Sequence, residues 1–115
     1  AATLENLVHE ENVRRLREAY EAQGLAVDGA GASEEQVEKA ILTYLVMYIL
    51  KAKAHTAARV LSQEHTIRKA YPQWPDTVEF AREVRNEVFD RSDANIASLT
   101  FNDTIRVVEE FNERY

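Results

Sequence analysis

The 115-residue chain is long enough for one compact domain and carries a formal net charge of −6. This acidic balance disfavours nucleic acids and membranes as partners, because both are bound by clustered Lys and Arg. The absence of cysteine excludes disulfides, thiolate nucleophiles and sulfur-ligated zinc, and it suits a reducing compartment, so we expect a cytoplasmic protein. Only three glycines and two prolines occur, which predicts an all-α fold for residues 1–115, a single bundle of about five helices.

The first predicted helix covers residues 4–23, where apolar residues recur at spacings of three and four, as on one face of a helix. Residues 24–32 contain all three glycines, so we expect a flexible connection there. Ser33 then has the character of an N-cap, and Gln36, three residues later, completes a capping box.

The second predicted helix, residues 34–52, contains the most apolar run of the chain. Between Ala40 and Leu50 (AILTYLVMYIL) only Thr43 is not apolar, so the helix is apolar on nearly every side. The run is shorter than the ~20 residues that span a bilayer. Two interpretations remain open. The helix lies at the centre of a monomeric bundle, or one of its faces packs against a second copy of the chain.

The third predicted helix covers residues 55–70 and is followed by the segment YPQWPD. Pro72 and Pro75 end this helix, because proline cannot donate a backbone hydrogen bond. Trp74, the only tryptophan, lies between the two prolines. It either plugs the end of the bundle or is an exposed aromatic anchor for a partner protein.

Two more helices are predicted, over residues 77–91 and 101–114. Asp76 precedes the first of them and is its expected N-cap. Thr100 and Asp103 have the spacing of a second capping box, which predicts that the last helix begins directly after Thr100.

Residues 41–67 (ILTYLVMYILKAKAHTAARVLSQEHTI) resemble a LisH (lissencephaly-homology) motif, which is a helical hairpin. The positions that carry the resemblance are Tyr44-Leu45, Tyr48-Ile49, Ala57-Ala58, Leu61 and Glu64. Lys53 and Ala54 replace the glycine and the aromatic residue of the motif's usual turn. A side chain at Lys53 disfavours a tight left-handed turn there.

The resemblance implies a homodimer that pairs through this hairpin, as in scaffold and cytoskeletal proteins. The expected interface residues are Ile41, Tyr44, Leu45, Tyr48, Ile49, Ala58, Leu61 and Glu64. Tyr44 and Tyr48 are good interface residues because they combine a large area with a polar tip, but they also fit the edge of a core. Glu64 holds the hairpin together through hydrogen bonds in a LisH motif, whereas a lone Glu on a helix is usually solvated.

Two other stretches, residues 16–41 and 89–108, resemble EF-hands with degraded loops. Calcium requires oxygen ligands at loop positions one, three, five and twelve. With Gly31 as the central glycine of the first loop, Asp28 is the only carboxylate at these positions. Calcium binding is therefore not expected there.

The second loop is poor in ligands as well. With Asp103 as its twelfth residue, the loop begins at Ser92, and positions three and five are Ala94 and Ile96. The resemblance then implies a calcium-independent EF-hand or light-chain-like adaptor that binds a partner helix in an apolar groove.

No motif for catalysis, cofactor binding or metal binding is present. The three histidines, His9, His55 and His65, are not spaced as a helical metal site, and no glycine-rich phosphate loop follows a strand pattern. We therefore expect a non-catalytic protein–protein interaction module without a cofactor. The leading prediction is a homodimer through residues 41–67 with a scaffold or adaptor role, and the alternative is the EF-hand-like adaptor.

Overall fold

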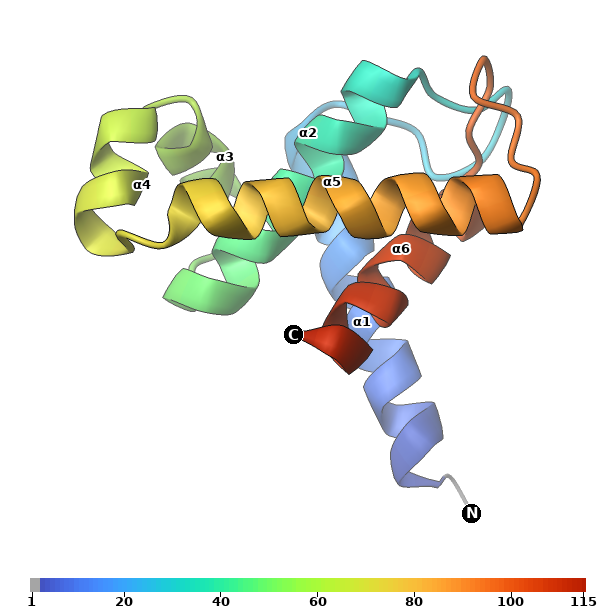
Figure 1. The fold of residues 1–115 in the computed structure, drawn as a ribbon, viewed down its shortest axis with the longest axis horizontal. Helices are drawn as coiled ribbons and strands as arrows, with labels where there is room; N and C mark the ends of the chain where they lie inside the picture. The colour runs from blue at the N-terminus through green and yellow to red at the C-terminus, as the bar shows by residue number, and fades with distance from the viewer. Residues whose placement is uncertain (1–2) are drawn as a thin grey trace.

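The computed structural model describes residues 3–115 and leaves out residues 1–2. The described residues form six helices and no β-strand: α1 (Leu4–Ala22), α2 (Glu34–Leu50), α3 (Ala54–Leu61), α4 (Glu64–Ala70), α5 (Trp74–Arg91) and α6 (Phe101–Arg114) (Figure 1). The all-α prediction is confirmed, with one helix more than expected. No helix within residues 3–115 combines the length and the apolar character needed to cross a membrane.

The additional helix arises because the predicted helix over residues 55–70 is divided into α3 and α4. Gln63 leaves the helical region, with φ −118° and ψ 73°. The Ser62 hydroxyl donates a hydrogen bond to the Arg59 carbonyl at 2.6 Å, which is the kind of local bond that competes with helix continuation. As a result α3 and α4 form a small lobe next to the N-terminal end of α5 (Figure 1).

The helix caps agree with the sequence in two places and differ in one. Ser33 with Gln36, and Thr100 with Asp103, both form complete capping boxes as predicted. Asp76, by contrast, is not an N-cap, because α5 begins at Trp74 with Pro75 in its first turn. Proline fits there, since its fixed φ is helical and no N–H is needed. Asp76 instead places a carboxylate near the positive end of the helix dipole.

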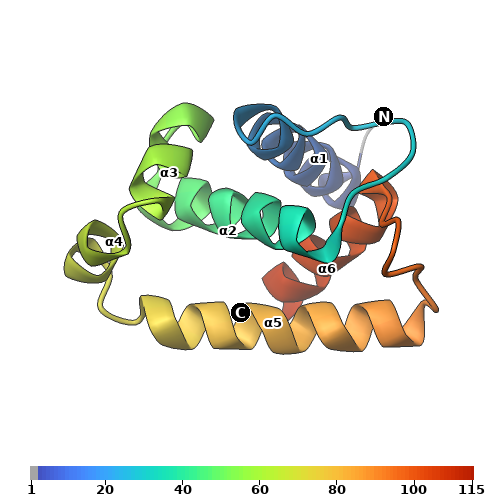
Figure 2. The same cartoon turned by 90° about the horizontal axis from the view of Figure 1, so that it is seen from above.

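The six helices are arranged as two helix–loop–helix units with the α3–α4 lobe between them. In the first unit α1 packs against α2, and in the second α5 packs against α6. The units join where α6 packs against α1 and α2, whereas α5 packs against α4 and α6 rather than against α2. Seen from above, α5 runs along one edge of the molecule and α2 lies behind it (Figure 2).

The two units are also joined through their loops, which lie side by side at the end of α5 opposite the lobe (Figure 1). The Ala32 amide donates to the Leu99 carbonyl at 2.7 Å, and the Leu99 amide donates to the Ala32 carbonyl at 2.9 Å. Gly31 has φ +93°, and a Cβ at this position would lie 2.9 Å from the Leu99 carbonyl oxygen. Only glycine therefore fits this approach of the loops without strain.

Helix α2 is the most enclosed element of the chain. Its buried residues are Val37, Ala40, Ile41, Thr43, Tyr44, Leu45, Val46 and Met47. They pack against α1, α3 and α6 of the same chain. The apolar run of the sequence is thus largely covered within one molecule.

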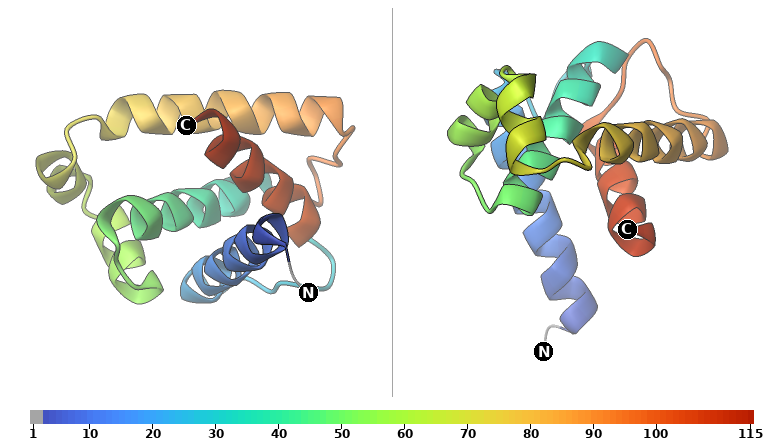
Figure 3. Two further views of the ribbon diagram at one scale, coloured as in Figure 1. Left: turned by 90° about the horizontal axis from the view of Figure 1, so that it is seen from below. Right: turned by 60° about the vertical axis from the view of Figure 1, so that its left-hand side comes forward.

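The first two turns of α1, in contrast to α2, are largely exposed. They project from the body of the molecule (Figure 3), and Leu4, Leu7 and Val8 are each at least half exposed. Glutamates at positions 5, 10 and 11 accompany this short apolar stripe.

Candidate functional site: an apolar groove between α2, α3 and α5

The structure separates the predicted interface residues of the hairpin into two groups. Ile41, Tyr44 and Leu45 are buried inside the single chain, with exposed fractions of 3%, 0% and 0%. They form no surface for a second copy in this fold, because α1, α3 and α6 already cover α2. The remaining predicted residues, which keep some exposure, are Tyr48, Ile49, Ala58, Leu61 and Glu64.

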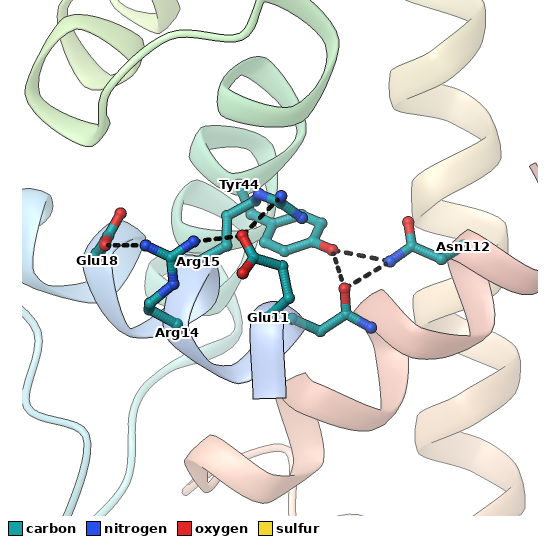
Figure 4. Close-up of polar contacts among 7 residues, drawn as sticks. Glu11, Arg14, Arg15, Glu18, Tyr44 and Asn112 are labelled. Carbon is teal, nitrogen blue, oxygen red and sulfur yellow. Dashed lines mark hydrogen bonds and ion pairs between the residues drawn. The ribbon is translucent and has the colours of Figure 1, made fainter. Parts of the chain in front are cut away.

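Tyr44 is held inside the chain by a polar triangle that joins α1, α2 and α6 (Figure 4). Its hydroxyl donates to the side-chain oxygen of Asn12 at 3.1 Å, and the Asn112 amide donates to that same oxygen at 3.2 Å and to the Tyr44 hydroxyl at 2.8 Å. Burial raises the pKa of Tyr44 above its ordinary value, so the hydroxyl stays protonated and able to donate. The polar tip that suggested an interface residue is therefore already satisfied.

Arg15 of α1 closes the same side of α2. Its guanidinium carbon lies 5.6 Å from the ring centroid of Tyr44 and 5.2 Å from that of Tyr48. Glu11 holds the guanidinium in place at 3.3 Å (Figure 4). Tyr48 remains 38% exposed, and the Lys51 ammonium lies 4.8 Å from its ring centroid. These cation–π contacts leave Tyr48 at a charged rim rather than in an apolar patch.

The other side of α2 is open. Between α2, α3 and α5 lies a groove of about 530 Å³. Its lining residues are Gln23, Lys39, Leu42, Ala58, Leu61, Ser62, Glu64, Trp74, Val78 and Arg82. We call this site the α2–α3–α5 groove. It exists because α5 packs on α4 and α6, which leaves a space between α5 and α2.

The floor of the groove is apolar. Leu42, Leu61 and Val78 are half-buried and come from three different helices. Trp74 also lines the groove but is only 3% exposed, so it is not an exposed anchor for a partner as the sequence also allowed. The ring instead forms part of the groove wall, because α5 begins at Trp74 and places it next to α3 and α4.

Four of the predicted residues are thus brought together in this groove: Ala58, Leu61, Glu64 and Trp74. The other six lining residues were not predicted from the sequence: Gln23, Lys39, Leu42, Ser62, Val78 and Arg82. Leu42 could not be singled out from the sequence, because it belongs to an apolar run in which nearly every position is expected to be buried. Val78 and Arg82 follow Trp74 at steps of four, and this spacing marks one face of α5.

The rim of the groove is charged and partly paired. Glu38 accepts from the Arg82 Nε at 2.6 Å and from the Arg85 Nη1 at 3.1 Å. Burial alone would raise the pKa of Glu38, but the hydrogen bonds and positive charges of both arginines outweigh it and hold that pKa below its ordinary value. These ion pairs connect α2 to α5 at the rim of the groove.

Glu64, at the other end of the groove, is exposed and pairs with Arg68 one turn along α4, at 3.0 Å. No hydrogen bond connects Glu64 to α2 within residues 3–115, so it does not bind the hairpin together as a LisH glutamate would. Lys39 has no ion-pair partner in the described part of the chain and lines the groove with its ammonium end in solvent.

The loops between the paired helices contain no set of cation ligands. Asp103 accepts from the Thr100 amide at 2.8 Å, and Gln36 accepts from the Ser33 amide at 2.9 Å, so both side chains are used for helix capping. Across residues 3–115 no three His, Cys, Asp or Glu side chains gather as a potential metal site.

Comparisons with models of protein families, with curated proteins and with solved structures found no match to this chain. The functional interpretation therefore rests on the geometry of the groove and of the paired loops.

Proposed function

We propose that this protein is a non-catalytic interaction module that binds an amphipathic helix of a partner protein in the α2–α3–α5 groove. The observation that carries the proposal is the apolar floor of this groove. Leu42, Leu61 and Val78 stay partly exposed although three helices fix them in place. A partner that covers them gains the free energy of apolar burial, about 25 cal/mol per Å².

The size of the groove is consistent with a few anchoring side chains rather than a whole helix. A volume of about 530 Å³ lies within the range of pockets that hold large side chains or small ligands. A helix presents such anchors at spacings of three and four residues, so one apolar stripe can lie along the floor. The surrounding polar residues, such as Gln23 and Ser62, are suited to the rim of this contact.

The paired loops support the adaptor type that the EF-hand resemblance implies. Leu99 is the eighth residue of the loop that begins at Ser92, and its bridging partner is Ala32. If Ala32 is also eighth, the first loop begins at Leu25, and no carboxylate occupies positions one, three, five or twelve. This register supports an adaptor that works without calcium.

Homodimerisation through residues 41–67 receives less support. The α2–α3 hairpin is present, but Ile41, Tyr44 and Leu45 are used inside the chain. A dimer through these residues would have to open the packing of α2 against α1 and α6, which leaves the Asn12–Tyr44–Asn112 triangle unpaired.

Trp74 makes the proposal testable, because it is the only tryptophan and it lines the groove. The probe is a tryptophan-free helical peptide of roughly 18 residues, five turns, with leucines on one face and glutamines on the other. Titration should shift the fluorescence emission of Trp74 and saturate. Light scattering should give the mass of one chain plus one peptide.

Two groove variants and one control complete the test. Leu61→Asp and Leu42→Gln should each weaken peptide binding at least about tenfold, because a polar group would enter the apolar contact. Leu7→Asp, on the exposed stripe of α1, should bind as the unchanged protein does. An unchanged protein that never responds to the peptide, or folded groove variants that bind equally well, would contradict the proposal. A mass of two chains without peptide would favour the homodimer instead.

A further inference from the structure

The charges of the chain are unevenly distributed, and the groove lies where positive charge is concentrated. The whole chain carries a net charge of −6, yet residues 51–69 contain five cations and only one carboxylate. The cations are Lys51, Lys53, Arg59, Arg68 and Lys69, all of them exposed. This segment includes most of the α3–α4 lobe, which lines the α2–α3–α5 groove with Ala58, Leu61, Ser62 and Glu64, and the five cations lie outside this lining.

The rim of the groove also carries positive charge. Lys39 and Arg82 line it from opposite walls, on α2 and α5. The one carboxylate in the lining, Glu64, is already neutralised by Arg68 at 3.0 Å. Glu38, next to the rim, accepts hydrogen bonds from Arg82 and Arg85, so Lys39 is the lining cation that has no ion-pair partner among residues 3–115.

We infer that the groove selects an acidic amphipathic helix, with glutamate or aspartate side chains flanking its apolar face. This inference rests on the proposed function and specifies its partner. Carboxylates on one flank reach Lys39, and those on the other reach Arg82. The exposed Lys39 ammonium gains a partner that the described chain does not supply.

The field of the whole molecule predicts the opposite preference. A chain with net charge −6 repels an acidic peptide and attracts a basic one at long range. At physiological ionic strength, charges beyond about 8 Å are largely screened, so the rim of the groove decides the preference at contact. A measured preference for the acidic peptide would therefore come from the charges at the rim of the groove and not from the net charge of the chain.

The experiment uses three helical peptides with the same leucine face and with glutamine, glutamate or lysine on the flanking positions. Binding is followed by Trp74 fluorescence in low salt, about 150 mM, where the screening length is about 8 Å, and in high salt, about 1 M, where it is about 3 Å. In low salt the glutamate peptide should bind about fivefold more tightly than the glutamine peptide, and the lysine peptide more weakly than both. In high salt the three affinities should converge.

Lys39→Glu should remove the advantage of the glutamate peptide. The matched control is Lys53→Glu, which makes the same charge change on the side of α3 that faces α1. It should retain most of the advantage. If all three peptides bind equally in low salt, or if the lysine peptide binds best, the inference is overturned while the proposed function stands. If none of the three binds, the proposed function itself fails.

Discussion

The two sides of helix α2 differ in how completely they are packed. On the side of α1 and α6, the large side chains other than Tyr48 are buried, and the polar groups of Tyr44, Asn12 and Asn112 satisfy one another. On the side of α5, Leu42 stays half-buried, and ion pairs connect Glu38 to α5. We refer to these as the closed side and the open side of α2.

The difference shows why an apolar helix is not by itself evidence for an interface. The closed side is a poor binding surface, because its apolar area is covered and its hydrogen-bonding groups are paired within the chain. The open side keeps apolar area that the fold positions but does not cover. Binding is expected where packing is incomplete, even though the most hydrophobic residues lie elsewhere.

The largest effect that tests this comparison is expected from Tyr44→Asp. Tyr44 is fully buried on the closed side, so a carboxylate there should cost at least about 4 kcal/mol and unfold the domain. Leu42→Asp, two residues away on the open side, should cost only about 1 kcal/mol, because its side chain can reach water. Thermal unfolding followed by circular dichroism measures both. Similar losses for the two variants would show that the sides of α2 do not differ.

The loop bridge joins the connection that precedes α2 to the connection that follows α5, at one end of the open side. Gly31→Ala should destabilise the protein by about 2–3 kcal/mol, since the new Cβ meets the Leu99 carbonyl in addition to the strain of φ +93°. Gly29→Ala is the matched control. It also has a positive φ, +106°, but open space around it, so about 1 kcal/mol is expected. Equal losses in denaturant unfolding would mean that the contact between the loops is unimportant.

A smaller effect is expected from the hydroxyl groups of the two tyrosines on α2. Tyr44→Phe should cost about 1 kcal/mol, because Asn112 loses one of its two acceptors inside the protein. Tyr48→Phe should cost less than about 0.5 kcal/mol, because that side chain is 38% exposed and its hydroxyl can bond water. Urea unfolding of both variants gives the comparison, and an equal cost would contradict the closed-side assignment.

The smallest effect concerns the ion pairs across the open side. The pKa of Glu38 lies below its ordinary value of 4.5 in the folded protein, so its contribution is present above pH 4.5 and is lost as the pH falls through the lowered value. Glu38→Gln should therefore lower the melting temperature slightly at pH 7, and this deficit should shrink as the pH is lowered below 4.5. Glu83→Gln, an exposed control on α5, should leave the melting temperature unchanged at both neutral and acidic pH. A Glu38→Gln deficit that does not shrink at acidic pH would show that charge is not its cause.

The sequence predicted the features that depend on neighbouring residues. The all-α class followed from composition, and the caps at Ser33 and Thr100 followed from residues three positions apart. The helix break at Gln63 and the start of α5 at Trp74 were missed, because weak local preferences were decided by packing of the α3–α4 lobe.

The candidate site was harder to predict because it depends on distant parts of the chain. The closed side of α2 requires Asn12 and Asn112, which are 100 residues apart. Nothing in the apolar run between Ala40 and Leu50 distinguishes the side that faces these residues from the side that faces α5. The groove residues Ala58, Leu61, Glu64 and Trp74 were selected for other reasons, and only the fold brings them together.

The most direct test of the account is a map of amide chemical-shift changes on adding the glutamate-flanked peptide. We predict changes at Leu42, Leu61 and Val78 and at the indole N–H of Trp74. Asn12, Tyr44 and Asn112, on the closed side, should be unaffected. Changes centred on the stripe of Leu4, Leu7 and Val8, or on the closed side of α2, would contradict the assignment of the α2–α3–α5 groove as the binding site.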